Sequence, residues 1–114
     1  MAEETLFTKI INREIPADIV YEDDLCLAFK DVNPQAPLHI LVIPKKHIEK
    51  ISDADKDERD LLGHLFLKAG EIARKNGYGE AFRLVINNGE DAGQTIFHLH
   101  IHILAGRNFV WPPG

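Results

Sequence analysis

Cysteine and long apolar runs are almost absent from this chain. Cys26 is the only cysteine among 114 residues, which excludes a disulfide framework and a finger-type zinc site with paired cysteines. No apolar run reaches the length of about 18 residues that a membrane-spanning helix needs. The first residues, Met1-Ala2-Glu3-Glu4, are acidic and lack the basic and apolar regions of a secretory signal. We therefore expect a cytoplasmic protein, because a lone thiol suits a reducing compartment.

Positive charge is also scarce. Lysine and arginine number 13 against 18 aspartate and glutamate residues, and the formal net charge is −5 at pH 7. An extended nucleic-acid interface needs a basic surface, so this balance argues against a nucleic-acid-binding protein. A small nucleotide can still bind, because local donors and backbone dipoles can outweigh net charge. The chain is 45% apolar and 27% charged and has no repeats or linkers, which predicts one globular domain over residues 1–114.

Hydrophobic periodicity predicts two helices and five short strands. A short amphipathic helix is expected over 5–13, and Pro16 limits its continuation. The segment Asp55-Lys56-Asp57-Glu58 resembles a capping box, and the long helix that follows ends at Asn76-Gly77. The strands are expected at 19–21, 26–29, 38–43, 82–86 and 96–104. Strands on both sides of one long helix favour the α+β class, with a five-stranded antiparallel sheet, that helix and the short N-terminal helix.

The last predicted strand carries three histidines at alternate positions. His98, His100 and His102 fall between apolar residues throughout 96–104. Alternate residues of a strand share one face at a spacing of about 6.5–7 Å, so the pattern predicts a row of imidazoles backed by a packed face. Such a row suits nucleophilic and acid–base catalysis near neutral pH. A zinc site built from H-x-H and one distant ligand stays open, although the carboxylates that usually orient metal-bound histidines are not evident beside this strand.

The loop that leads into this strand, residues 87–95, is rich in Asn, Gly and Asp. Gly89 and Gly93 would let backbone N–H groups converge on an anion, and Gln94 and Thr95 add side-chain donors. The same composition is typical of an ordinary hairpin loop. Together with the histidine row, however, the loop indicates attack at a phosphorus atom.

Four segments of the chain resemble one known family. They are 98–104, which fits the pattern H-φ-H-φ-H-φ-φ with φ apolar, then 31–39, 41–47 and the ending Trp111-Pro112-Pro113-Gly114. This sequence is similar to the histidine triad (HIT) family over about residues 7–114. The terminal segment and Pro34-Gln35-Ala36-Pro37 resemble its branch of histidine triad nucleotide-binding proteins (Hint), which act as purine nucleoside phosphoramidases.

The resemblance implies a role for each polar residue of the site. His100 would be the nucleophile at the α-phosphorus of a purine nucleoside 5′-phosphoramidate, or of an acyl-nucleotide of similar shape, and His98 would orient it. His102, with Gln94 and loop N–H groups, would stabilise phosphoryl charge. Thr95, where many Hint-type proteins have serine, would pass a proton to the leaving nitrogen. His39 would be the fourth member of the catalytic cluster.

The same resemblance implies a set of nucleotide-binding residues, with Asp31 on the ribose hydroxyls and no metal or cofactor required. These residues are Phe7, Phe29, Lys30, Asp31, Val32, Asn87, Gly93, Gln94, Thr95, His100 and His102. Lys45, Lys46, His47 and His64 are expected to be solvated or structural residues.

The resemblance also implies a homodimer whose C-terminal tail lies near the partner's site, which would bring Trp111 there. Two alternatives from other classes accompany the zinc protein. One is a dinucleoside polyphosphate hydrolase that uses the same triad. The other is a regulatory or scaffold protein that binds nucleotide with little turnover.

Overall fold

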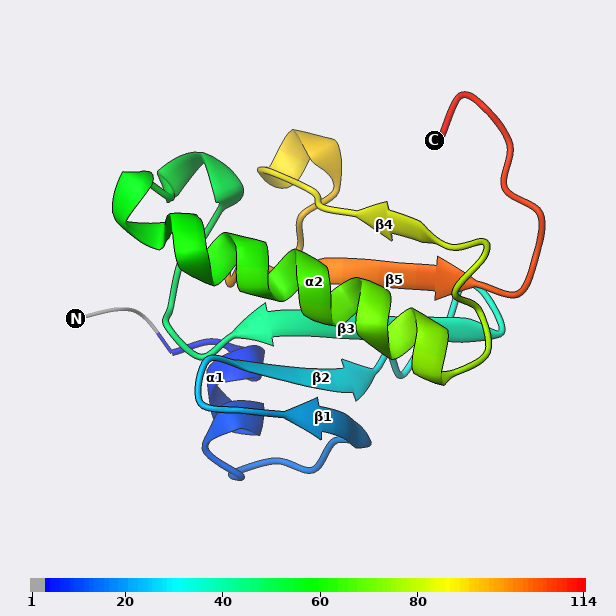
Figure 1. Ribbon diagram of the computed structural model, residues 1–114. Coiled ribbons are helices and arrows are strands. Elements are labelled where there is room, and N and C mark those ends of the chain that lie inside the picture. The colour runs from blue at the N-terminus through cyan, green and yellow to red at the C-terminus, as the bar shows by residue number, and fades with distance from the viewer. Residues whose placement is uncertain (1–3) are drawn as a thin grey trace.

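A five-stranded antiparallel sheet forms the centre of the molecule (Figure 1). The computed structural model describes residues 4–114, and the residues Met1 to Glu3 of the acidic N-terminus lie outside the described part. The strands lie in the order β1-β2-β3-β5-β4. They are β1 (Ile19–Glu22), β2 (Cys26–Lys30), β3 (Leu38–Pro44), β4 (Arg83–Val85) and β5 (Ile101–Ala105). The helices are α1 (Leu6–Ile11) and α2 (Arg59–Lys75), so the predicted α+β architecture is confirmed.

Local side-chain hydrogen bonds set the starts of both helices, with Thr5 and Thr8 forming a capping box at α1 and Asp55 and Glu58 forming one before α2. Asp55 accepts from the backbone N–H of Asp57 at 2.8 Å, and Glu58 accepts from the backbone N–H of Asp55 at 3.3 Å. This confirms the predicted capping box, which opens a single 3₁₀ turn, Lys56–Glu58, that runs directly into α2. Asn76 ends α2, and Gly77 follows with φ +87°, a conformation that favours glycine.

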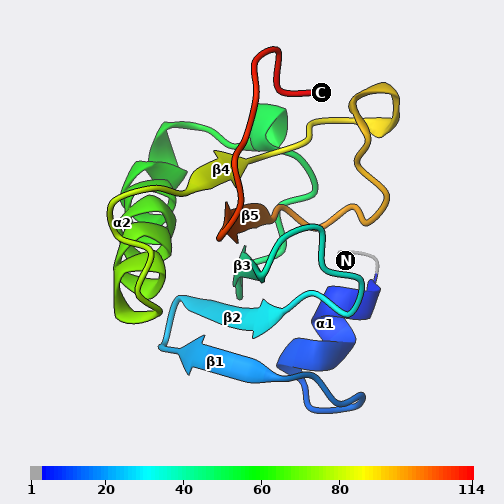
Figure 2. The same ribbon diagram turned by 90° about the vertical axis from the view of Figure 1, so that its right-hand side faces the viewer.

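The two faces of the sheet are covered by different helices (Figure 2). On one face, α2 packs against alternate buried residues of the central strands: Cys26, Ala28, Ile40, Val42, Ile101 and Ile103. On the other face, α1 packs against the residues between them, and this smaller cluster contains Phe7, Ile10, Leu27, Phe29, Leu41 and Ile43. Side chains of a strand alternate between its two faces. His39 in β3 and His102 in β5 stand next to residues that face α2, so both lie on the α1 side. The site therefore belongs to the α1 face.

The strand predicted over 96–104 is shorter than expected. β5 pairs with β3 only from Val42↔Ile101 to Leu38↔Ala105, so His98 and His100 precede the strand. β3 itself continues two residues past Val42, to Pro44, so the ladder with β5 stops before β3 ends. Beyond that point the incoming chain bonds to the segment after β3, with the Leu99 N–H donating to the Ile48 carbonyl at 2.7 Å. The predicted alternation of faces nevertheless holds, because Leu99, Ile101 and Ile103 all join the core beneath α2.

Cys26 lies in this core with no exposed surface. Burial raises the pKa of its thiol to about 12, and the nearby charge of Asp23 adds to the effect. Within residues 4–114, no helix combines the length and apolar character needed to cross a membrane. The cytoplasmic location inferred from the lone cysteine stays a prediction.

Candidate active site

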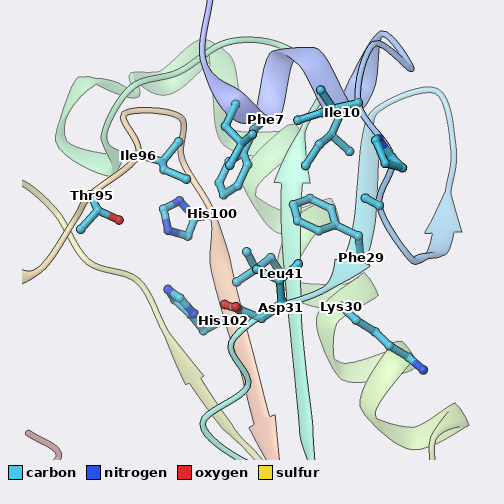
Figure 3. Close-up of a pocket in the computed structure, with 15 residues that line it drawn as sticks. Phe7, Ile10, Phe29, Lys30, Asp31, Leu41, Thr95, Ile96, His100 and His102 are labelled. Carbon is cyan, nitrogen blue, oxygen red and sulfur yellow. The ribbon is translucent and has the colours of Figure 1, made fainter.

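A cavity of about 410 Å³ opens between α1, strands β2 and β3, and the chain entering β5 (Figure 3). Its walls are mainly apolar, and a few polar groups converge at one side, as in most small-molecule sites. The predicted nucleotide-binding residues that line it are Phe7, Phe29, Lys30, Asp31, Val32, Thr95, His100 and His102. The lining residues that the sequence prediction missed are Leu6, Ile10, Ile15, Pro16, Ala17, Leu41 and Ile96. Leu6 and Ile10 lie near Phe7 on the predicted helix, so its apolar spacing was the available signal.

His100 presents a free nitrogen to this cavity. Its Nδ1 lies 2.7 Å from the backbone carbonyl oxygen of His98, and a carbonyl can only accept, so Nδ1 carries the proton. In the neutral ring the lone pair therefore resides on Nε2, the far edge of a ring that lines the cavity. Burial lowers the pKa of His100 below its ordinary value, against the opposing effects of the His98 carbonyl and the Asp31 carboxylate. The site thus holds a neutral imidazole in the tautomer of a nucleophile.

His102 has the opposite tautomer, fixed by a chain of hydrogen bonds. The backbone N–H of Gln35 donates to His39 Nδ1 at 3.0 Å, which leaves the proton of neutral His39 on Nε2. That Nε2–H donates to His102 Nδ1 at 2.9 Å, so His102 carries its own proton on Nε2. Burial lowers the pKa of both rings, that of His102 to about 4, which favours the neutral forms. His102 is consequently a hydrogen-bond donor beside an acceptor, with 5.0 Å between its ring centroid and that of His100.

Asp31 lies at the end of β2 with its carboxylate oriented by neighbours. One oxygen accepts from the backbone N–H of Asn33 at 2.8 Å, and the other lies 3.4 Å from His39 Nε2. The side chain keeps 20% of its surface exposed, so this carboxylate can still accept from a ligand. It combines an acceptor pair with an adjacent apolar wall, which suits a polyhydroxylated ring such as ribose.

His98 lies on the α1 face, with its ring centroid 6.0 Å from that of Phe7, but it does not line the cavity. Its ring is 1% exposed, its Nε2–H donates to the Pro44 carbonyl at 2.8 Å, and it stacks on His47 with centroids 4.9 Å apart. Burial lowers its pKa to about 4, although the Pro44 carbonyl opposes the shift. The predicted orientation of His100 by His98 thus comes from the backbone carbonyl of His98, while its ring anchors the chain.

Gln94 also differs from the prediction. Its side-chain N–H groups donate to the carbonyls of Glu49 at 2.7 Å and Ile96 at 3.0 Å, while its Oε1 accepts from the Gly89 N–H at 2.8 Å. The amide is therefore fully engaged within the protein and braces the loop instead of offering a donor to phosphate. Gly89 and Gly93 do adopt the positive φ values expected of the loop, +93° and +97°.

The other predicted residues fall at the rim or behind it. Thr95 is exposed and directs its hydroxyl toward the two imidazoles (Figure 3). Lys30 points its ammonium away from the cavity and lies 3.5 Å from Asp18, and Val32 is 99% exposed, so neither encloses a ligand in this conformation. Asn87 lies behind the loop, where its side chain approaches Gly93.

Metal ligation is possible at two clusters of the described residues. The groups are Asp31, His39 and His102 at the cavity, and Asp23, Cys26 and His64 on the α2 face. In both, the nitrogen and oxygen donors already hydrogen-bond to one another or to the backbone, as His64 Nε2 does to Asp23 at 2.6 Å. Of the two H-x-H pairs in the triad, His98 and His100 are not arranged for a shared zinc, because the His98 Nε2–H donates to the Pro44 carbonyl. The rings of His100 and His102 lie side by side, with centroids 5.0 Å apart.

Comparison with known proteins gives consistent matches over nearly the whole chain. The sequence model of the HIT domain matches residues 12–109. An uncharacterized HIT-like protein of Synechocystis sp. is 68% identical over 114 residues, the full length of both chains. A HIT family hydrolase from Legionella pneumophila superposes with TM-score 0.95 at 46% identity, covering 97% of this chain and 100% of that one. A histidine triad protein from Clostridium difficile superposes with TM-score 0.91 at 46% identity, covering 96% and 97% respectively.

Proposed function

The chain belongs to the HIT domain family, and from that premise we propose that it is a nucleotide hydrolase of the Hint type. Its substrates would be purine nucleoside 5′-phosphoramidates, or acyl-nucleotides of similar shape, and its product a nucleoside monophosphate. The observation that carries the proposal is the pair of opposite tautomers at the cavity. His100 offers a lone pair and His102 offers an N–H, each fixed by its hydrogen bond at Nδ1.

In the first step, His100 Nε2 attacks the α-phosphorus and the bond from phosphorus to the leaving nitrogen breaks. The imidazole ring gains positive charge, which the His98 carbonyl stabilises through the Nδ1–H bond of 2.7 Å. The His102 Nε2–H donates to a non-bridging phosphoryl oxygen, where negative charge develops. The Thr95 hydroxyl passes its proton to the departing amine and regains one from solvent.

In the second step, water attacks the phosphorus of the nucleotidyl-histidine and the P–Nε2 bond breaks. The water proton passes to solvent, the nucleoside monophosphate leaves, and His100 returns to its neutral form. Splitting one displacement into two in this way is the usual gain of covalent catalysis.

The nucleoside end of the substrate would occupy the apolar part of the cavity. Asp31 would accept from the ribose hydroxyls, and the base would lie among Phe7, Ile10 and Phe29. Phe7 and Phe29 already pack edge to face with ring centroids 5.4 Å apart, so they form a rigid wall for a planar base.

Trapping the covalent intermediate tests the proposal. The protein is mixed with adenosine 5′-phosphoramidate, quenched in denaturant and analysed by intact-mass and peptide mass spectrometry. We expect one nucleotidyl group on His100, no adduct in His100→Ala, and an adduct in the control His64→Ala, whose residue lies on the opposite face. Free imidazole should restore part of the turnover to His100→Gly if only the nucleophile is missing.

Three other results would contradict this assignment. An adduct that persists in His100→Ala would place the nucleophile elsewhere. Faster turnover of a dinucleoside polyphosphate than of the phosphoramidate would favour the sister activity, and tight mononucleotide binding without any adduct would favour a regulatory binding protein.

For assembly we propose a homodimer that uses α2 and an edge of the sheet. The outer side of α2 leaves Phe66 43% and Leu67 75% exposed, and such a dimer would bury both side chains. Trp111 in the tail is 82% exposed and would gain a neighbour if it reached the partner's cavity.

A further inference from the structure

The segment that carries the nucleophile is held by the chain that follows β3. Residues 94–100 precede β5, and four of their hydrogen bonds lead to residues 44–49. The His98 ring donates to the Pro44 carbonyl at 2.8 Å, and the Leu99 N–H donates to the Ile48 carbonyl at 2.7 Å. His47 donates to the Phe97 carbonyl at 2.9 Å. We call residues 44–49 the clamp.

Within the clamp, His47 makes two contacts to the residues on either side of one peptide bond. Its Nε2–H bonds to the carbonyl of Phe97, and its ring stacks on that of His98 at an interplanar angle of 23°. The next carbonyl along the chain, that of His98, is the one that accepts from His100 Nδ1. His47 thus fixes the peptide unit immediately before the one that sets the tautomer of His100.

We propose that His47 is a positioning residue for His100, acting through the Phe97 carbonyl and the His98 ring to hold the His98 carbonyl in place. The kinetic part of this inference rests on the proposed function, while the structural part concerns the free protein alone. His47 lines a separate surface pocket with Thr95 and Ile96 and does not line the nucleotide cavity. It would therefore affect His100 indirectly, without touching the substrate.

The physical reason is that no β-ladder holds the His98 carbonyl within the described residues: its own peptide unit is held by the Leu99 N–H bond to the Ile48 carbonyl, and the unit before it by His47. A β-ladder would fix it through neighbouring strands, but pairing with β3 begins only at Ile101. If the Phe97 peptide tilts, the carbonyl of His98 moves with it. The His100 Nδ1–H then loses its acceptor, and the Nε2 lone pair no longer points toward the phosphorus. A misplacement of about 1 Å can cost about 10²-fold in rate.

The test compares His47→Leu, which removes the donor, with His47→Gln, whose amide can still reach the Phe97 carbonyl. His64→Leu is the matched control, because His64 is also partly buried and bonds through Nε2, at 2.6 Å to Asp23, but on the opposite face. Three quantities are measured: the single-turnover rate of nucleotidyl transfer, the affinity for a mononucleotide, and the low-field NMR signal of the His100 Nδ1–H.

We expect His47→Leu to lower the transfer rate about tenfold, which corresponds to about 1.4 kcal/mol, with unchanged mononucleotide affinity. The His100 Nδ1–H signal should weaken through faster exchange with water, while His47→Gln should keep both the signal and most of the rate. His64→Leu should lower stability without changing either. If His47→Leu does not fold, His47→Asn, whose shorter amide does not reach Phe97, replaces it.

Several outcomes would overturn the inference. They are an unchanged Nδ1–H signal in His47→Leu, a rate loss no larger than that of His64→Leu, or a rate loss in His47→Gln equal to that in His47→Leu. Because the NMR signal is recorded without substrate, it tests the positioning role even if no nucleotidyl transfer occurs. Failure of the proposed function and failure of this inference are therefore distinguishable.

Discussion

Mild acid should destabilise the fold before most carboxylates titrate, because His98 and His102 are neutral when folded. Burial lowers the pKa of each to about 4, against about 6.5 in an unfolded chain. Between these two pKa values the unfolded chain binds more protons than the folded protein. The contribution of each neutral histidine to the free energy of unfolding is therefore fully present above pH ~6.5 and is lost as the pH falls toward ~4. At about pH 5 one such histidine lowers the free energy of unfolding by about 2 kcal/mol, and two lower it by about 4 kcal/mol. The whole free energy of unfolding of a domain is typically about 5–15 kcal/mol.

Urea unfolding followed by circular dichroism between about pH 7.5 and 5 measures this loss directly. The slope of the unfolding free energy with pH should approach two protons at the acid end of this range. His98→Gln retains an amide that can donate to the Pro44 carbonyl but does not titrate, so its slope should be smaller by about one proton. A flat profile for the native chain, or an unchanged slope in His98→Gln, would refute the assignment of buried neutral histidines.

Three further predictions concern the site and the assembly. His100→Ala should abolish turnover while leaving the unfolding midpoint nearly unchanged, because the ring faces the cavity and not the α2 core; retained activity in a steady-state assay would remove its role as nucleophile. Asp31→Ala should weaken mononucleotide binding by about tenfold to 150-fold, the cost of about 1.5–3 kcal/mol for a lost charged hydrogen-bond partner; calorimetric titration with unchanged affinity would contradict this. Light scattering should show a dimer at micromolar concentration, and deletion of residues 111–114 should change selectivity among amine leaving groups more than the dimer mass; a monomer would refute both.

Much of the fold follows from patterns that act over a few residues. The capping box at Asp55 and the stop at Asn76-Gly77 are local chemistry, so both ends of α2 could be predicted. The period of two around His100 correctly separated the packed face from the polar one, because burial alternates along extended chain whether or not the ladder continues.

The parts that could not be predicted depend on residues distant in sequence. The start of β5 depends on its pairing with β3, more than fifty positions earlier, which stops at Val42 although β3 continues to Pro44. The amide of Gln94 suits a phosphate as well as a backbone carbonyl, and only the proximity of Glu49 decides between them. His47 carried no signal by itself, because its role depends on where Phe97 and His98 lie.

Burial at the α1 face links catalysis to acid sensitivity. The same desolvation that keeps His100 neutral, with a lone pair for the proposed attack, also disfavours protonation of His98 and His102. The folded state therefore loses stability as the pH falls. An uncharged substitute such as glutamine at His102 should therefore stabilise the protein near pH 5 relative to the native chain while it slows transfer. The α2 face, whose core is almost wholly apolar, carries no such conflict. The apolar core on the α2 face thus stabilises the fold at any pH, whereas the buried histidines of the α1 face serve the proposed chemistry and lower the stability of the fold in acid.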